Sequence, residues 1–265
     1  MWKSLFTIAI HSIRPQPCAL YSRMNCITNH MYSGEWIGDT YVWPETSTVC
    51  CGLYLHTRDD LMQLMENEPL LMLGDSLSRR FAYTLNEIYK GTERIDYDLM
   101  SHGTVPIEYK HNLHVLFSYR PLFSHVLQYL EHEKLLNTII ISVADHYVGH
   151  ESMWEPDILK LFHHINTTRL YLTHDIIFRT EPDPDSDTQV NKKISQMIYK
   201  WIHPFYILDH RRLAMPKSHG MLRDKGNSKE HYGPHVRLVL VESFAVFYHT
   251  RLQIIKRPSF FNEYI

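Results

Sequence analysis

The chain has 265 residues, with 27 Lys and Arg against 29 Asp and Glu, and a formal net charge of −2 at pH 7. Its 19 His titrate near pH 6.5, so the balance becomes positive in a mildly acidic compartment. Hydrophobic residues at 44% and charged residues at 21% are ordinary globular values, which excludes disorder, collagen and coiled coil. General nucleic-acid binders carry an excess of basic residues, which this near-neutral chain does not have, so no nucleic-acid partner is expected.

The N-terminal segment carries Lys3 and then the apolar stretch from Leu5 to Ile10, which is too short to span a bilayer. His11 interrupts this stretch and no small-residue cleavage site is clear, so the segment is a weak match to a signal peptide. No later apolar run approaches 18 residues. We therefore expect no membrane-crossing segment further along the chain, and we leave anchoring through the N-terminus open.

All four Cys, at positions 18, 26, 50 and 51, lie in the first fifth of the chain. They form no CxxC pair, which disfavours a zinc site. Two interpretations remain, a disulfide-pinned segment made in an oxidising compartment and a set of reduced structural cysteines. Adjacent Cys50 and Cys51 cannot easily share one partner, so at least one is expected to pair upstream. We divide the chain into a Cys-containing lead-in, residues 1–66, and one α/β domain, residues 67–265.

Beyond residue 67, short apolar runs alternate with amphipathic stretches, which is typical of βαβ units and a mainly parallel sheet. The strands are predicted at Leu70 to Leu73, His114 to Ser118, Thr138 to Ala144, Arg169 to Thr173 and Phe205 to Leu208. The helices are predicted at Ser78 to Tyr89, Ser124 to Leu136, Pro156 to Ile165, Val190 to Ile202 and Pro234 to His249. This order predicts a three-layer α/β/α sandwich around a mainly parallel five-stranded sheet. Right-handed crossovers then bring the functional loops to the carboxyl edge of that sheet.

The first predicted strand turns through Gly74, Asp75 and Ser76 straight into an amphipathic helix. A serine at such a turn presents its hydroxyl near backbone N–H groups and the positive end of the helix dipole, where a developing oxyanion is stabilised. Ser76 is therefore a candidate nucleophile. The alternative is that Ser76 or Asp75 only caps the helix. The Gly-x-Ser-x-Gly elbow of α/β-hydrolases is absent.

The segment from Gly74 to Arg79, Gly-Asp-Ser-Leu-Ser-Arg, resembles the GDSLxR block of the PC-esterase branch of the SGNH hydrolase superfamily. That branch includes the trichome-birefringence-like polysaccharide O-acetyltransferases and the sialate O-acetyltransferases. Upstream, Gly34 to Trp36 and Tyr41 to Pro44 resemble the Cys-containing lead-in of many such proteins. The similarity covers residues 34–85 and returns near residue 231. It implies an SGNH-type fold, an acyl-enzyme on Ser76, no cofactor or metal, and a location in the secretory pathway, either Golgi or secreted.

A serine nucleophile needs a general base, and the base needs an acceptor that orients it. The resemblance places the base at His231, in the loop before the last predicted helix, where Pro234 suits the first helical position. The family carries an Asp three residues before this His, but Ser228 stands there in this chain. Asp224 is the candidate acid if the loop folds back. Asn227, a backbone carbonyl or no carboxylate at all are the alternatives.

The resemblance also implies oxyanion donors on the loops after the second and third strands. Gly103 matches the first of these, with a plain turn glycine as the alternative. The second loop has no Asn and contains Asp145 and His146, of which His146 is the donor candidate because a carboxylate would repel an oxyanion. Its alternative is a loop histidine paired with nearby acids. Arg79 holds the family's arginine position and opposes the helix dipole, so we expect it to pair with an acidic side chain or a substrate group.

Two functions follow from these residues. The first is a serine acyl-esterase or O-acetyltransferase that acts on acetyl esters of carbohydrate or glycoconjugate hydroxyls, or on a small-molecule ester, and passes the acyl group to water or to a sugar hydroxyl. The second is a non-catalytic SGNH-like carbohydrate-binding protein with a degenerate acid. Trp36, Tyr41 and Trp43 either stack on sugar or pack in the core. A metallo-hydrolase is disfavoured because no HxH or HExxH spacing stands on a suitable element, and His163 with His164 is among the nearest matches.

Overall fold

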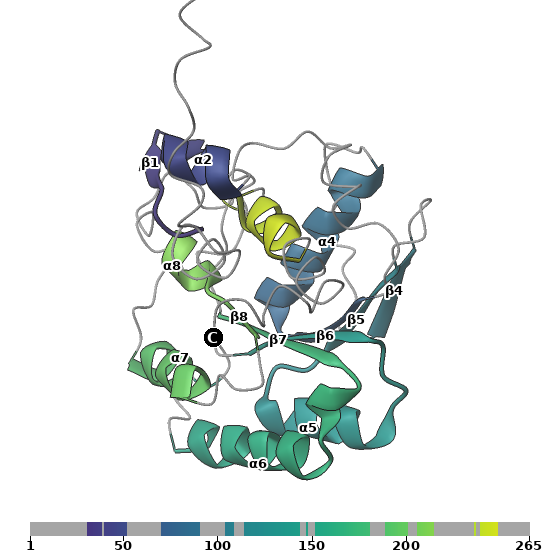
Figure 1. Cartoon of the computed structure of the whole chain (residues 1–265). Helices are drawn as coiled ribbons and strands as arrows, with labels where there is room; N and C mark the ends of the chain where they lie inside the picture. The colour runs from purple at the N-terminus through teal and green to yellow at the C-terminus, as the bar shows by residue number, and fades with distance from the viewer. Residues whose placement is uncertain are drawn as a thin grey trace, which may run out of the picture.

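The computed structural model of the chain describes residues 31–38, 40–51, 70–90, 104–108, 114–143, 147, 152–180, 189–200, 206–214, 236 and 239–248. In these residues one mixed sheet lies between two layers of helices (Figure 1). The predicted α/β class and the three-layer arrangement are therefore confirmed.

The main sheet has six strands in the described residues. In spatial order they are β4 (Thr104–Glu108), β5 (His114–Tyr119), β3 (Leu70–Gly74), β6 (Thr138–Ser142), β7 (Asp175–Arg179) and β8 (Tyr206–Leu208). The five strands from β5 to β8 run parallel, whereas β4 pairs antiparallel with β5 at one edge. Numbered along the chain, the parallel strands take the doubly wound order 2-1-3-4-5. The strand order therefore reverses at β3.

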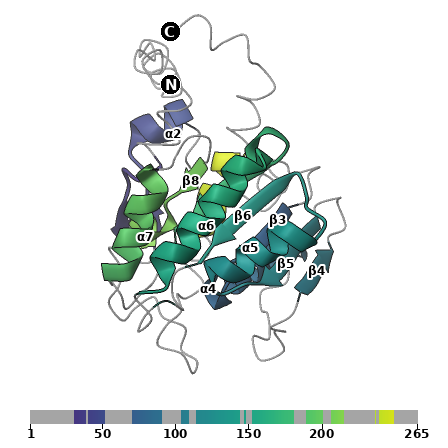
Figure 2. The same cartoon turned by 90° about the horizontal axis from the view of Figure 1, so that it is seen from below.

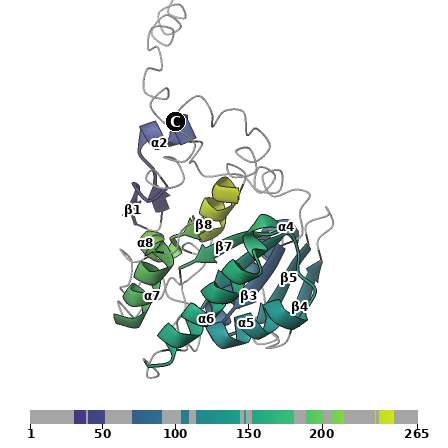
Figure 3. The same cartoon turned by 60° about the horizontal axis from the view of Figure 1, so that its bottom comes forward.

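The helices are divided between the two faces of this sheet. One face packs against α4 (Ser76–Lys90) and against the helical residues 239–248, whose Phe244 ring lies 5.6 Å from the Phe81 ring of α4. The other face is covered by α5 (Phe123–His132), α6 (Trp154–Thr167) and α7 (Gln189–Lys200), as Figure 2 shows from below. Figure 3 shows the helical residues 239–248 on the far side of the sheet from α5 and α6.

Strand β3 shows why the central strands contain almost only apolar residues. Leu70 and Met72 face the α4 side, whereas Leu71 and Leu73 face the α5 and α6 side, and all four are fully buried. A parallel strand covered on both faces needs apolar side chains at every position. The strands predicted at β3, β5, β6 and β8 are confirmed.

The strand predicted from Arg169 to Thr173 is wrong. These residues follow α6 and contain a 3-10 turn, η5 (Leu170–Leu172), and Arg169 adopts a left-handed backbone with a φ of 52°. The fourth parallel strand is β7, which begins a few residues later. The strand was predicted from the short apolar run at Leu170 to Leu172, but Leu172 is 68% exposed. The fully buried run in β7 was the correct signal.

The described part of the lead-in packs onto the α/β domain. It contains a small hairpin, β1 (Glu35–Ile37) and β2 (Thr40–Val42), followed by α2 (Glu45–Cys51). Tyr41 and Trp43 are buried in the same apolar cluster as the α4 side of the sheet, and burial raises the pKa of Tyr41 to about 12. The Trp36 indole donates a hydrogen bond to the carbonyl of Leu213, 3.0 Å away, in α8 (His210–Ala214). These contacts support the core-packing interpretation of the three aromatic residues.

Cys50 and Cys51 at the end of α2 are both disulfide-bonded, and the part of the chain that the structure describes holds no free cysteine. The disulfide interpretation of the lead-in is therefore confirmed for these two residues. The boundary placed between residues 66 and 67 lies outside the described residues and stays a prediction. None of the described helices is both long and apolar enough to cross a bilayer.

Candidate active site

Ser76 lies at the carboxyl edge of the sheet, where the strand order reverses. Strand β3 ends at Gly74, Asp75 links the two elements, and α4 begins at Ser76. In open α/β sheets the loops diverge at such a point, and ligands bind in the crevice that this leaves outside the carboxyl ends of the strands. The topology therefore puts the predicted nucleophile where this fold class commonly binds its ligands.

Gly74 is required by close packing at this turn. A Cβ atom at Gly74 would overlap the carbonyl oxygen of Ser142 in β6 and the side chain of Ser78 in α4. The carbonyl of Gly74 also accepts a hydrogen bond of 2.7 Å from the N–H of Arg120, just after β5. Only a residue without a side chain lets α4 start this close to β6.

Asp75 caps α4. One oxygen of its fully buried carboxylate accepts hydrogen bonds from the N–H groups of Leu77, at 2.9 Å, and Ser78, at 3.4 Å. These are donors that the first turn of a helix cannot satisfy internally. The capping role therefore belongs to Asp75, and Ser76 is the first helical residue, with a half-buried side chain.

Ser78 is the second serine of the turn and is not available as a nucleophile. Its side chain is fully buried, and its hydroxyl donates a hydrogen bond of 3.0 Å to the carbonyl of Ser142. This bond joins α4 to the last residue of β6. Of the two serines in the motif, only Ser76 retains solvent access.

Arg79 is 9% exposed, and its guanidinium lies 5.9 Å from the centroid of the Tyr119 ring at the end of β5. Burial raises the pKa of Tyr119, the nearby Asp75 carboxylate raises it further, and the Arg79 charge lowers it. Both charges thus lie close to the same phenol. The Asp75 carboxylate offsets the unfavourable position of a cation at a helix N-terminus. A contact of Arg79 with substrate stays a prediction.

Arg179, the last residue of β7, is a second buried cation at this edge, with 2% of its surface exposed. One terminal nitrogen, Nη1, donates hydrogen bonds to the hydroxyls of Ser142, at 2.6 Å, and Ser78, at 3.4 Å. Its Nε donates to Nδ1 of His210, at 2.8 Å. The guanidinium also lies 4.7 Å from the centroid of the Phe81 ring in α4. The sequence prediction missed Arg179; the available signal was a charged residue ending a buried apolar strand.

His210 is held in one neutral form by these contacts. A guanidinium has no acceptor, so Nδ1 of His210 must accept from Arg179, and the ring proton is then on Nε2. Nε2 lies 3.2 Å from the hydroxyl of Ser243, which in turn donates to the carbonyl of Leu240, at 2.9 Å. Complete burial lowers the pKa of His210 well below its usual value, and the Arg179 charge lowers it further. A buried neutral imidazole with both nitrogens engaged is a structural group and not a general base.

Tyr147, which follows β6 in the chain, is held in place by its own side chain. Its side chain is fully buried and stacks on Phe123, with 5.6 Å between the ring centroids. Its hydroxyl accepts a hydrogen bond of 2.7 Å from the N–H of Phe123 and donates one of 2.9 Å to the Asp157 carboxylate. Burial raises the pKa of Tyr147, and the Asp157 carboxylate raises it further. The residue next to the oxyanion candidate His146 is thus anchored between α5 and α6.

The structure places Ser76 and Arg79 together in the first turn of α4, at the carboxyl edge where both were expected. The other candidate site residues lie outside the described residues and stay predictions: His231, Asp224, Gly103 and His146.

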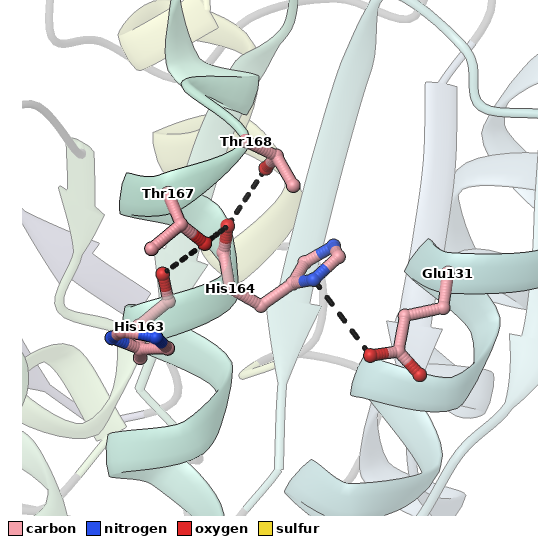
Figure 4. Close-up of polar contacts among 5 residues, drawn as sticks. All are labelled: Glu131, His163, His164, Thr167 and Thr168. Carbon is pink, nitrogen blue, oxygen red and sulfur yellow. Dashed lines mark hydrogen bonds and ion pairs between the residues drawn. The ribbon is translucent and has the colours of Figure 1, made fainter.

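His163 and His164, noted as a possible metal pair, have ordinary helix-surface contacts. Nδ1 of His164 lies 3.8 Å from a carboxylate oxygen of Glu131 on α5, and the carbonyls of the two histidines accept hydrogen bonds from Thr167 and Thr168 (Figure 4). Among the described residues no group of three His, Cys, Asp or Glu is arranged to hold a metal ion.

No protein-family model matches the chain, and no curated protein matches it. Solved structures that match include two mutant forms of Axe2 from Geobacillus stearothermophilus. A catalytic mutant, described as an acetylxylan esterase, has a TM-score of 0.38 and 11% identity, covering 55% of this chain and 77% of that chain. A second mutant, described as an acetyl-xylooligosaccharide esterase, has a TM-score of 0.46 and 10% identity, covering 71% of this chain and 96% of that chain.

Proposed function

We propose that the protein is an SGNH-type serine acyl-esterase or O-acetyltransferase that acts on acetyl esters of carbohydrate or glycoconjugate hydroxyls. The observation that carries the proposal is the position of Ser76, half-buried at the N-terminus of α4 and directly after the strand where the sheet order reverses. The resemblance of the Gly74 to Arg79 segment to the GDSLxR block supports the same assignment.

In this mechanism the Ser76 hydroxyl attacks the carbonyl carbon of the acetyl ester while His231 takes its proton, and Asp224 orients the imidazole. The tetrahedral oxyanion is held by the Ser76 N–H together with Gly103 and His146. Collapse of this intermediate breaks the ester C–O bond, and His231 returns the proton to the leaving alcohol. Water or a sugar hydroxyl then attacks the acetyl-enzyme, with His231 again as base, and Ser76 is released.

The charges around the turn suit this chemistry. Asp75 puts a buried carboxylate next to the nucleophile, which by itself would disfavour a developing oxyanion. Arg79 and Arg179 place two guanidiniums at the same edge. The dipole of α4 adds further positive potential at Ser76. The edge of the sheet is therefore not left with an uncompensated negative charge.

A secretory location, in the Golgi or outside the cell, belongs to the same proposal. The disulfide bonds of Cys50 and Cys51 support it, because disulfides form and persist mainly in oxidising compartments. The resemblance to secretory O-acetyltransferases points the same way.

A non-catalytic carbohydrate-binding protein is the second candidate, and Ser228 in place of the family's Asp is the observation that favours it. The lead-in gives it little support. Tyr41 and Trp43 are buried in the core, and the indole N–H of Trp36 is bonded to the carbonyl of Leu213. Within the described residues these rings do not form an exposed platform for stacking on sugar.

The first experiment is labelling of the purified full chain with a fluorophosphonate probe, which reacts with activated serines. We expect labelling of the wild type, its loss in Ser76→Ala, and its retention in Ser195→Ala, a control serine on α7. Release of acetate from acetylated oligosaccharides, with and without a sugar acceptor, then separates hydrolysis from transfer. A folded wild type that takes up no label contradicts the esterase proposal and favours the binding protein, whereas labelling that survives Ser76→Ala moves the nucleophile elsewhere.

A further inference from the structure

We propose that Arg179 is a positioning residue for the Ser76 nucleophile, which it holds in place by bracing the first turn of α4 against the carboxyl ends of β6 and β7. This inference rests on the proposed function. It assigns a role to a side chain that lies 101 positions from Ser78 in the chain and outside the GDSLxR segment.

The guanidinium of Arg179 contacts β6, α4 and α8 at the same time. Nη1 reaches the Ser142 hydroxyl at the end of β6 and the Ser78 hydroxyl in α4, while Nε reaches His210 at the start of α8. The Phe81 ring of α4 covers the guanidinium at 4.7 Å. The planar fork of an arginine can make these contacts simultaneously, whereas a lysine presents a single ammonium.

Ser78 transmits this bracing to the nucleophile. It lies two residues after Ser76 in the same helical turn, and it is bonded to Ser142 both directly, through the carbonyl, and through Arg179. Gly74 leaves the space that this close approach needs. A shift of Ser78 would therefore move the start of α4, and with it the Ser76 hydroxyl, relative to the general base. Displacements of this kind cost an enzyme rate even when its fold is intact.

The same network continues to the C-terminal helix. His210, fixed as the neutral Nε2–H form by Arg179, bonds to Ser243 in the helical residues 239–248. In the sequence this helix follows His231, the predicted base. Arg179 thus lies between the element that carries the nucleophile and the element that follows the base, and it sets their spacing.

The distribution of buried charge supports a role at the site. Among the described residues, the buried Asp, Glu, Lys and Arg side chains are Asp75, Arg79, Arg179 and Glu242. All four belong to the β3–α4 turn, β7 or the C-terminal helix, which are the segments that the network joins. Buried ions cost several kcal/mol each to desolvate, and an apolar residue commonly stabilises a core at least as well. Three of these ions, Asp75, Arg79 and Arg179, lie at the carboxyl edge of the sheet, which is the arrangement expected where fixed charges and dipoles position reacting groups.

The test compares the fluorophosphonate labelling rate of Arg179→Lys with that of the wild type, well below both melting temperatures. The lysine keeps the charge and loses the fork, so we expect the second-order rate constant to fall at least about tenfold. With an acetyl ester substrate, kcat should fall while KM stays within about twofold. The control is Ile158→Ala, a fully buried residue of α6 on the opposite face, which should lower the melting temperature and leave the labelling rate of the folded protein unchanged.

A second variant covers the case in which Arg179→Lys does not fold. Ser142→Ala removes only the acceptor at 2.6 Å, and we expect it to slow labelling by a smaller factor. If folded variants of Arg179 and Ser142 are labelled at the wild-type rate, whatever their melting temperatures, Arg179 is only a structural residue and the inference is wrong. Absence of labelling in the wild type has a different meaning, because it contradicts the proposed function itself and the inference with it.

Discussion

Three side chains at the β3–α4 turn have three different roles. Asp75 caps the helix, Ser78 anchors it to β6, and Ser76 keeps solvent access between them. Capping and nucleophilic catalysis were alternatives for this turn when only the sequence was considered. The geometry shows that Asp75 can cap the helix without using Ser76, so the capping role leaves the nucleophile assignment intact.

Replacing Gly74 should damage this turn specifically. The new methyl group in Gly74→Ala meets the Ser142 carbonyl and the Ser78 side chain, and the hydrogen bond between these two residues prevents either from moving away. We expect a loss of about 1–3 kcal/mol in the free energy of unfolding and slower fluorophosphonate labelling of Ser76. Urea titration and labelling rates measure the two effects.

The matched control is Gly38→Ala in the β1–β2 turn. Gly38 has a φ of 59° but open space around it, so the alanine adds backbone strain without an overlap. It should cost about 1 kcal/mol and leave labelling unchanged. Equal labelling rates for the two variants would refute the account of Gly74.

At the scale of elements, the sequence predicts four of the six strands in the described main sheet, namely β3, β5, β6 and β8. Strand β4 was missed because Pro106 in its centre argues against a strand. Proline is tolerated there because β4 is an edge strand, paired only with β5 in the described sheet. The strand predicted at Arg169–Thr173 has a different cause, since two short apolar runs stand close together there and only the second, in β7, is buried in the sheet.

The candidate site also contains residues that the sequence predicts and residues that it does not. Ser76 and Arg79 are predictable because a local motif carries them within one turn of helix. Arg179, His210 and Ser243 are not, because each becomes meaningful only when the fold brings segments more than 30 positions apart into contact. Their roles depend on which strands lie side by side at the carboxyl edge, and this strand order cannot be read directly from a single sequence.

The contact between β7, α8 and the C-terminal helix should make stability depend on pH. The pKa of His210 in the folded protein lies below its ordinary value of 6.5, so the folded form binds fewer protons than the unfolded chain as the pH falls below 6.5. The stability that neutral His210 contributes is therefore fully present above pH 6.5. It is lost progressively as the pH falls below 6.5 toward the lowered value.

His210→Asn isolates this effect from the other histidines. Its amide oxygen can accept from Arg179 and its amide nitrogen can donate to Ser243, but the group does not titrate. We expect the free energy of unfolding of the wild type to fall more steeply than that of the variant between pH 6.5 and 5, and the two to run parallel above pH 7. Parallel curves over the whole range would show that His210 is not held neutral.

At the scale of the whole molecule, the lead-in supports the edge that carries the site. The Tyr32 hydroxyl accepts a hydrogen bond of 2.8 Å from the N–H of Asp209, and the Arg212 guanidinium lies 5.4 Å from the centroid of the Tyr32 ring. Together with the bond from Trp36 to Leu213, these contacts hold α8, whose first residue is His210. The lead-in is thus linked to the network of Arg179 through one short helix.

Breaking the disulfides of Cys50 and Cys51 should therefore loosen more than the lead-in. We expect a reductant to lower the free energy of unfolding by about 2–4 kcal/mol and to slow the labelling of Ser76, because α8 loses part of its support. Melting curves and labelling rates with and without the reductant measure both effects.

The double variant Cys50→Ser with Cys51→Ser should resemble the reduced wild type and respond little to the reductant. A wild type with the same melting temperature in both conditions would contradict the stabilising role of these disulfides. A lower melting temperature with an unchanged labelling rate would instead confine their effect to the lead-in and separate it from the active-site edge.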